Sequence, residues 1–416
     1  MKLEVCTIGT ELLLGHTTDT NAVDLGRALA AAGVEVVRRT TVPDRPRAIR
    51  DAVADALTRT GAVLTTGGLG PTRDDLTKPI VAELFGMPLK LDAGLLTALE
   101  ARFRRAGRDT MPPSNRSQAE VPEGAVILPN PRGTAPGLWL EDAAGRLAIL
   151  LPGVPREMRG LLTEQVLPRL VARVGAAPRV VRSRTLRTTG VPESALGERV
   201  GPLEEALAPL SLAYIPSADG VDLRLTAWSL DPAEADRLLA AGADRLRREL
   251  GAHCYGEDEA DLAAVVLGQA RARRARLAVA ESCTGGLLGA RLTAVPGASD
   301  TFVGGTVAYD DAVKTGVLGV PAEILERHGA VSEEAVRAMA AGAARVFGVR
   351  YALAITGIAG PGGGTPEKPV GTVWLALQAD GATAAVRRVF PGDRAEIRAR
   401  SAQAALDLLR RHLGEG

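Results

Sequence analysis

A glycine-rich turn directly after a short apolar strand is the feature that most constrains this fold. Residues 62–66 (AVLTT) are typical of a buried strand, and the turn 67–75 (GGLGPTRDD) follows at once. Helical periodicity resumes from about Leu76 to Phe85. Glycines between a strand and a helix let the backbone approach a phosphate closely, and the helix N-terminus adds N–H groups and positive potential. The pattern predicts a ligand-binding α/β sheet.

Strand-like and helix-like stretches alternate along the whole chain, which is typical of α/β folds with parallel strands. We predict a doubly wound first domain over residues 1–172, with a linker-like segment at 175–179. A small α+β module is expected over 173–255 and a second α/β domain over 256–416. The first domain is predicted to contain strands at 2–8, 34–39, 62–66, 125–128, 138–141 and 147–151, and helices at 20–32, 46–61, 76–85, 93–106 and 155–173.

The two later domains follow different patterns. The middle module has the order β-α-β-β-α, at 180–188, 193–200, 210–216, 221–229 and 232–250, with no phosphate loop, so a spacer or dimerisation role is favoured. The last domain is expected to contain a helix at 259–275, strands at 276–280, 301–309, 351–355, 371–378 and 384–390, and a final Arg-rich helix.

Composition excludes several classes of protein. A net charge of +1 and 3% aromatic residues argue against a protein that mainly binds nucleic acid. Three distant cysteines and four histidines without paired spacing argue against a disulfide scaffold or a zinc site. Glu4 and Glu11 interrupt the N-terminal apolar stretch, so no signal peptide is expected, and no apolar run is long enough to span a membrane. A cytoplasmic location is expected.

The first candidate site is the turn 67–75, with Gly67, Gly68 and Gly70 as its backbone contacts and Thr72 as a hydroxyl donor. Asp74 and Asp75 would repel a phosphate directly, so we expect them to bind a hydrated divalent metal ion or to accept hydrogen bonds from ligand hydroxyl and amino groups. The alternative is that the glycines only form a turn and one aspartate caps the helix.

The second candidate site is the segment 281–286 (ESCTGG), which joins a strand to a helix. Ser282 is expected at the mouth of the sheet, with the N–H groups of Thr284, Gly285 and Gly286 directed outward as an oxyanion hole or phosphate cradle. A serine N-cap is the alternative. Cys283 competes as a nucleophile, but such a residue is more often a small buried hydrophobe.

Because no histidine lies near Ser282 in sequence, its activation must come from Tyr, Lys or Thr. Candidates stand at two further strand ends: Tyr309 with Lys314 at the first, and Thr356 with Gly357 and Gly360 of the following loop at the second. On the final helix, Arg394 and Arg398 are spaced i, i+4 and would present two guanidinium groups to a phosphate.

The first site resembles the molybdopterin-binding domain of molybdenum-cofactor biosynthesis proteins, whose GGxGPTxDD string residues 67–75 match. The segments 9–11 (GTE), 130–137 (NPRGTAPG) and 152–158 (PGVPREM) also fit, and the second of these adds Gly133 and Thr134 to the ligand contacts. The resemblance implies a nucleotide-like ligand with a phosphate or diphosphate, and a metal-dependent step carried by Asp74 and Asp75.

The C-terminal stretch resembles the nicotinamide-nucleotide amidohydrolases through AESCTGG at 280–286, YxxxxKxxxLGV at 309–320 and TGxAGP at 356–361. Both resemblances in this order, joined by a module similar to a KH domain without a GxxG loop, resemble the CinA (competence/damage-inducible) family. The family's tyrosine is usually followed by Ser-Asn, whereas Asp310 and Asp311 follow Tyr309 here.

The resemblance implies a cytoplasmic, homodimeric enzyme of pyridine-nucleotide salvage with nucleotide substrates and no membrane contact. The C-terminal domain would hydrolyse nicotinamide mononucleotide to nicotinate mononucleotide and ammonia without a cofactor. The N-terminal domain would cleave ADP-ribose to AMP and ribose 5-phosphate with a divalent metal (Mg, Mn, Co or Ni). Two alternatives remain, a molybdopterin-binding or adenylylating protein and a non-enzymatic, competence-related binding protein.

Overall fold

The computed structural model describes residues 1–108, 110–175 and 179–414. The chain forms two compact units, residues 1–182 together with 227–237, and residues 183–226 together with 238–416. Residues 176–178 of the predicted linker lie outside the described residues. Within the described part of the chain, no helix combines the length and apolar character needed to cross a membrane.

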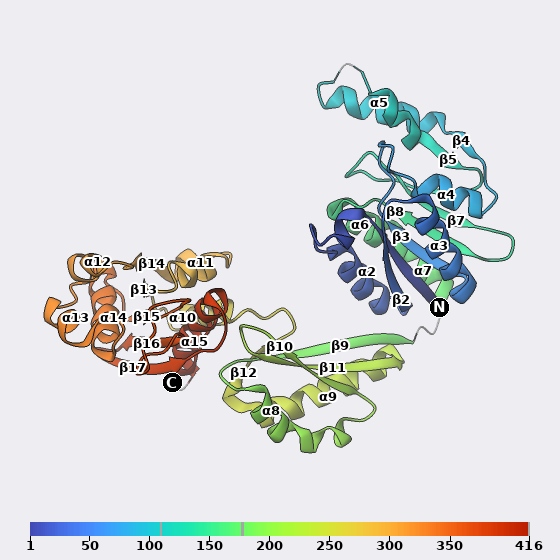
Figure 1. The fold of residues 1–416 in the computed structure, drawn as a ribbon. Coiled ribbons are helices and arrows are strands. Elements are labelled where there is room, and N and C mark those ends of the chain that lie inside the picture. Colours follow the sequence, from blue (N-terminus) through green and yellow to red (C-terminus); the bar gives the residue numbers. More distant parts are fainter. Residues whose placement is uncertain (109, 176–178, 415–416) are drawn as a thin grey trace. The chain divides into compact units, whose positions relative to one another are not determined.

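The N-terminal domain is built on a sheet with strand order β2-β1-β3-β8-β7-β6 (Figure 1). Strands β1, β2, β3 and β8 are parallel, and β7 and β6 are antiparallel additions at one edge. A short ribbon, β4 with β5, lies beside α5. The strands are β1 (Lys2–Ile8), β2 (Glu35–Val42), β3 (Ala62–Thr66), β4 (Leu89–Leu91), β5 (Glu120–Pro122), β6 (Val126–Leu128), β7 (Gly137–Glu141) and β8 (Leu147–Leu151).

Helices cover both faces of this sheet, which confirms the predicted doubly wound class. Side chains of α3 and α4 share one core with the sheet, and those of α2, α6 and α7 share the other. The helix predicted at 155–173 contains a π-helical segment, η2 (Leu162–Val166), between α6 and α7. The helices are α1 (Thr10–Leu13), α2 (Thr20–Ala31), α3 (Pro46–Thr60), α4 (Thr77–Leu84), α5 (Ala93–Arg105), α6 (Pro155–Leu161) and α7 (Leu167–Val174), with a 3-10 turn η1 (Pro113–Ala119).

The middle module is an antiparallel sheet of order β10-β11-β9-β12 that carries two helices (Figure 1). The sequence predicted its first five elements but missed β12, which pairs with β9 and forms one edge of the sheet. The elements are β9 (Val180–Thr188), α8 (Glu193–Val200), β10 (Ser211–Pro216), β11 (Val221–Leu230), α9 (Pro232–Leu250) and β12 (Cys254–Glu257), with 3-10 turns at Gly201–Leu203, Glu205–Leu207 and Gly251–His253.

The C-terminal domain has strand order β14-β13-β15-β16-β17, in which the first three strands are parallel and the last two antiparallel. Helices α10, α11 and α15 share a core with one face, and α14 packs on the other. The strands are β13 (Leu277–Glu281), β14 (Phe302–Val307), β15 (Tyr351–Gly357), β16 (Thr372–Ala379) and β17 (Ala382–Val389), and the helices are α10 (Leu262–Ala272), α11 (Leu287–Thr293), α12 (Asp311–Gly316), α13 (Ala322–His328), α14 (Glu333–Phe347) and α15 (Arg394–Gly414), with a 3-10 turn at Ala298–Asp300.

The glycines of the first turn are required by its geometry. Gly67 has φ +105°, and a Cβ there would overlap the carbonyl oxygen of Ile8. Gly61, which ends α3, also has positive φ, but a Cβ there would meet nothing within 4 Å. A side chain at Gly61 would therefore add backbone strain alone, whereas a side chain at Gly67 would add backbone strain and a steric clash.

We predict that Gly67→Ala destabilises the N-terminal unit by more than 2 kcal/mol, whereas Gly61→Ala costs about 1–2 kcal/mol, because only the first change adds a clash to the positive-φ penalty. Calorimetry on the full chain would measure both shifts. Equal shifts in the two variants would show that the Gly67 turn can relax away from Ile8.

Candidate active sites

Three neighbouring parallel strands bring the C-terminal candidates to one edge of the sheet. The Ser282 N–H, at the end of β13, donates to the Ile355 carbonyl of β15 (2.9 Å). The Ala308 N–H, just after β14, donates to the Glu281 carbonyl (2.7 Å). Since Thr356 follows Ile355 and Tyr309 follows Ala308, the predicted candidates of all three strand ends lie on the same side of the sheet.

The buried carboxylate of Glu281 organises the turn after Ser282, a role that the sequence motif did not reveal. Glu281 is 1% exposed. Its Oε2 accepts the N–H groups of Gly286 and Leu288 (both 3.0 Å), and its Oε1 accepts that of Gly289 (2.8 Å). The Glu281 carboxylate therefore caps helix α11, and a negative charge is stabilising at a helix N-terminus.

This capping corrects one expectation. The N–H of Gly286 does not point outward toward a ligand, since it donates to Glu281, and that of Gly285 donates to the Ser282 carbonyl (3.0 Å). The expectation that the N–H groups of Gly285 and Gly286 form an oxyanion hole or phosphate cradle is therefore wrong. Thr284 is fully buried, and its backbone carbonyl accepts hydrogen bonds from two N–H groups of Arg398 (2.7 and 3.2 Å).

Ser282 and Cys283 have different environments. Ser282 is 8% exposed, and among the described residues its hydroxyl has no hydrogen-bond partner. Cys283 packs in the core that α10, α11 and α15 share with the sheet, and burial raises the pKa of its thiol to about 12. A thiol with that pKa is protonated near neutral pH and is a poor nucleophile. The environment favours Ser282.

Tyr309 and Lys314 lie close together but face different surroundings. Tyr309 is 59% exposed, whereas Lys314 is 1% exposed. The Lys314 ammonium donates to the Tyr309 carbonyl (3.1 Å) and to Asp311 Oδ1 (2.9 Å). Asp311, one of the two residues that depart from the family pattern, thus supplies the counter-ion of the buried lysine.

The two arginines of α15 contact the loops of the other candidates. Arg394 donates to the Gly360 carbonyl (2.6 Å) and to the Tyr309 hydroxyl (3.0 Å). Arg398 reaches Thr284 as described above. The Thr356 hydroxyl donates to the Ala330 carbonyl (2.8 Å), so it remains free to accept a hydrogen bond.

An open cavity of about 550 Å³ lies beside these arginines. Gly360, Arg394 and Arg398 line it, together with Ala359, Pro361, Val370 and the helix start at 392–395. Gly357 ends β15 and packs against Val373, without lining this cavity. Ser282, Tyr309, Lys314 and Thr356 do not line it either, and Tyr309 is connected to it through Arg394.

The N-terminal turn is held by contacts to neighbouring strands and by Thr77. The Gly67 N–H donates to the Leu151 carbonyl of β8 (3.0 Å), and the buried Thr77 hydroxyl donates to the Gly67 carbonyl (2.9 Å). Gly68 has φ +68°, and a Cβ there would overlap Thr77 Oγ1. Thr77 is a site residue that sequence reasoning missed, since nothing in its spacing marks its hydroxyl as a clamp.

The two aspartates of this turn have different roles. Asp75 Oδ2 accepts the N–H (2.8 Å) and the hydroxyl (2.5 Å) of Thr72, and a Cβ on Gly70 would overlap this carboxylate. Asp74 is exposed, and the neighbouring Thr72 side chain together with the Asp74 N–H lowers the pKa of its carboxyl. Asp74 is therefore an ionised carboxylate that faces solvent, whereas Asp75 closes the turn.

The loop with Gly133 and Thr134 lies at the same edge of the sheet, between β6 and β7. Asn130 Nδ2 donates to Glu157 Oε2 at the start of α6 (2.7 Å), and a Cβ on Gly133 would overlap that carboxylate. Thr134 is half-buried. This loop therefore packs on α6 and is not hydrogen-bonded to the turn 67–75.

Two further polar residues stand near this edge. Asn21 is buried, and its Nδ2 donates to the Gly153 carbonyl (2.7 Å) and to Thr66 Oγ1 (3.1 Å). Burial lowers the pKa of Lys78 to about 8. Across the described ranges, no group of three or more His, Cys, Asp or Glu side chains is arranged to hold a metal.

Comparisons with known proteins agree with this architecture. Family models match residues 4–172 ("Probable molybdopterin binding domain"), 183–256 ("Damage-inducible protein CinA KH domain") and 259–413 ("CinA C-terminal domain"). A CinA-like protein from Gemmatimonas aurantiaca is 55% identical over 411 residues, covering 99% of this chain and 96% of the relative. One from Salinibacter ruber is 44% identical over 414 residues, covering 99% of this chain and 100% of the relative.

Among solved structures, the competence damage-inducible protein A of Klebsiella pneumoniae is 40% identical. It covers 37% of this chain and 95% of its own, with a TM-score of 0.36.

We predict that Glu281→Ala lowers the stability of the C-terminal domain by roughly 3 kcal/mol or more, because backbone donors at the start of α11 lose their acceptor in a buried setting. Glu281→Gln keeps one acceptor oxygen and should lose less. The matched control is Asp310→Ala, which removes an exposed cap of α12 and should cost only about 1 kcal/mol. Calorimetry measures all three, and equal losses for Glu281→Ala and Asp310→Ala would contradict the capping role.

Proposed function

The chain belongs to the CinA family, as its motifs predicted, and from this premise we propose that its C-terminal domain hydrolyses nicotinamide mononucleotide. The products would be nicotinate mononucleotide and ammonia. The observation that carries the proposal is the position of Ser282, a partner-free hydroxyl at a strand end whose turn is fixed by Glu281. The high pKa of the neighbouring Cys283 thiol supports the serine as the nucleophile.

In the proposed reaction, Ser282 Oγ forms a bond to the carboxamide carbon and its proton passes to the leaving nitrogen. The C–N bond then breaks and releases ammonia, and water hydrolyses the resulting ester to free the carboxylate and Ser282. Thr356 Oγ1 can accept a hydrogen bond, which suits a role in orienting the Ser282 hydroxyl or the substrate amide. Lys314 and Tyr309 are proposed to transfer the proton, a contribution typically worth about 10²–10⁴-fold.

The 5′-phosphate is proposed to bind in the cavity beside Arg394 and Arg398. Each guanidinium has five N–H donors, so the contacts to Gly360, Tyr309 and Thr284 leave donors for a phosphate. The planar fork of arginine favours bidentate contacts with phosphate oxygens. The loop requires glycine at position 360, because its φ is +79° and a side chain there would clash with Val370.

For the N-terminal domain, we propose cleavage of ADP-ribose to AMP and ribose 5-phosphate. The residues fit a divalent cation held jointly by protein and ligand, since Asp74 is an exposed, ionised carboxylate and Mg²⁺ commonly uses one or two carboxylates with substrate phosphates. A bound cation would neutralise charge on the diphosphate. The chain's own contribution is the turn 67–75, whose backbone is fixed by Thr77 and by the Asp75–Thr72 contacts.

A molybdopterin-handling role is the second candidate for this domain, favoured by the family model matched at residues 4–172. It assigns no reaction to the C-terminal site. Assembly into a homodimer stays a prediction of the family resemblance. Incubation with nicotinamide mononucleotide or ADP-ribose, with and without divalent cations, separates these functions by their products.

We predict that Ser282→Ala abolishes ammonia release from nicotinamide mononucleotide, whereas Cys283→Ala retains at least a tenth of it, because only the hydroxyl is free at the strand end. An ammonia assay on purified full-length protein measures both. Retained activity in Ser282→Ala with loss in Cys283→Ala would assign the chemistry to the thiol.

We predict that Asp74→Asn removes metal-dependent ADP-ribose hydrolysis without changing protein stability, because the exposed carboxylate has no structural partner outside its own turn. Asp75→Asn should lower both hydrolysis and stability, since it weakens two hydrogen bonds from Thr72. Metal titrations and calorimetry on both variants measure this. Unchanged metal dependence in Asp74→Asn would show that the turn needs no carboxylate–cation contact.

A further inference from the structure

A second, larger cavity of about 690 Å³ lies within the second compact unit, where the middle module meets the C-terminal domain. The module contributes residues 189–192, 218–220 and His253. Strands β16 and β17 and helix α15 form the other wall. The volume is in the range typical of small-molecule sites, about 300–1,000 Å³. Neither Ser282 nor the turn 67–75 takes part in it.

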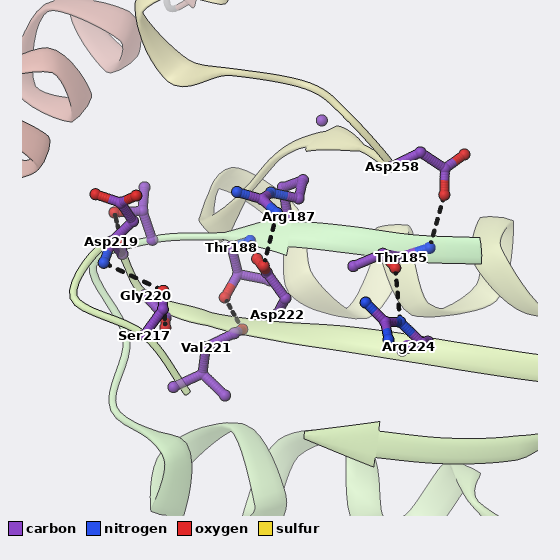
Figure 2. Close-up of polar contacts among 12 residues, drawn as sticks. Thr185, Arg187, Thr188, Ser217, Asp219, Gly220, Val221, Asp222, Arg224 and Asp258 are labelled. Atoms are coloured by element: carbon purple, nitrogen blue, oxygen red, sulfur yellow. Dashed lines mark hydrogen bonds and ion pairs between the residues drawn. The ribbon is translucent and has the colours of Figure 1, made fainter. Parts of the chain in front are cut away.

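The wall supplied by the module is fixed by buried polar contacts (Figure 2). The Thr188 hydroxyl donates to the Val221 carbonyl (2.5 Å), its N–H donates to Asp222 Oδ1 (3.3 Å), and Arg187 pairs with Asp222 (3.0 Å). A Cβ on Gly220 would overlap the Thr188 carbonyl oxygen, so the turn between β10 and β11 lies tightly on β9. The wall is thus formed before any ligand binds.

Two arginines on the opposite wall have no acidic partner among the residues that the structure describes. Arg400 is half-buried, and its guanidinium makes no hydrogen bond or ion pair there, while its Nε is fully buried. Within the same residues, Arg388 donates to the neighbouring Arg387 carbonyl alone (3.2 Å). Removing the Arg400 guanidinium from water without an acceptor costs free energy, so this side chain favours an anion beside it, and the exposed Arg388 adds a second positive charge.

The acidic residues of the same cavity are already paired with other cations. Asp407 accepts hydrogen bonds from Arg410 (2.6 and 2.9 Å) and from Arg411 (2.8 Å). Asp219 lies 3.4 Å from the Arg291 guanidinium. The unpaired charge of this cavity is therefore positive and comes from Arg388 and Arg400.

Leu375, Val386, Phe390 and Leu408 form an apolar part of the lining, to which Thr189, His253 and Gln403 add polar groups. An apolar surface beside cationic groups matches a ligand that joins a flat ring to a phosphate. We propose that this cavity is a second nucleotide site that binds a nucleoside monophosphate, with the phosphate on Arg388 and Arg400 and the base on the apolar wall.

The segment 390–394 connects this cavity to the one beside Arg394. Phe390 and Pro391 line the larger cavity, and residues 392–394 line the smaller one. A nucleotide bound in the larger cavity would restrict this segment and change mononucleotide binding in the smaller one. Only this consequence rests on the proposed deamidase function, whereas the binding itself does not.

The test is calorimetric titration of AMP into the full-length protein with a chelator present, to suppress metal-dependent binding elsewhere. Arg388→Ala and Arg400→Ala should each weaken one AMP-binding component at least tenfold. The matched control is Arg387→Ala, because Arg387 lies on the opposite side of β17 and donates to the Glu367 carbonyl (2.9 Å). It should change AMP affinity less than twofold.

Adenosine and inorganic phosphate, titrated separately, should each bind at least tenfold more weakly than AMP. Unchanged AMP binding in Arg388→Ala, or equal loss in Arg387→Ala, would overturn the site. Arg388 is exposed, so its replacement tests the site even if Arg400→Ala fails to fold. A steady-state assay adds the second readout: AMP should change KM for nicotinamide mononucleotide in the wild type but not in Arg388→Ala. An unchanged KM in the wild type would overturn the coupling between the two cavities. If the protein does not deamidate nicotinamide mononucleotide at all, the AMP titration still decides whether the site exists.

Discussion

The parallel pairing of β13 with β14 and β15 determines where Ser282, Tyr309 and Thr356 lie. Hydrogen bonds from Ser282 to Ile355 and from Ala308 to Glu281 continue the strand register past the ends of the strands. Parallel strands direct their carboxyl ends to one edge, and the loops there are free to carry polar side chains because the helices, not the loops, cover the core. The N-terminal sheet follows the same rule, with the turn 67–75 bonded to the end of β8.

Glu281 changes what this edge can do chemically. A helix that begins after a glycine turn normally offers its N–H groups to an anion, and the sequence was interpreted in that way. Here an internal carboxylate takes those donors, so the start of α11 is already neutralised. Positive potential for the proposed phosphate must then come from side chains, and Arg394 and Arg398 line the cavity. This division would separate the Ser282 hydroxyl, the proposed nucleophile, from the proposed phosphate contacts.

Much of this fold could be predicted from the sequence, because strands with buried apolar runs and glycine turns carry strong local signals. The predicted strand 62–66 and the helix ending at Gly61 agree with the structure. What could not be predicted depends on partners distant in sequence or on backbone groups that every residue has. β12 was missed because it is short and is stabilised by pairing with β9. Helices α12, α13 and α14 were missed as well; they lie in the connection between the parallel strands β14 and β15. The role of Glu281 was missed because its partners are backbone N–H groups. The turn-closing role of Asp75 was missed because it depends on the fold of the turn, which brings the N–H and the hydroxyl of Thr72 to one carboxylate oxygen.

Helix α15 shows why the middle module bears on the chemistry of a domain that has its own sheet. With 3.6 residues per turn, Arg394 and Arg398 lie on one side of the helix, and the cavity-lining stripe of Arg400, Gln403, Asp407 and Arg411 lies on another. Asp393 and Glu396 fix the helix start by reciprocal capping (both 2.9 Å), so the first turn cannot adjust independently of the helix that follows. Any shift of the stripe against the module would move the guanidinium groups of Arg394 and Arg398 with it. The middle module could therefore influence the proposed mononucleotide binding through the orientation of one helix.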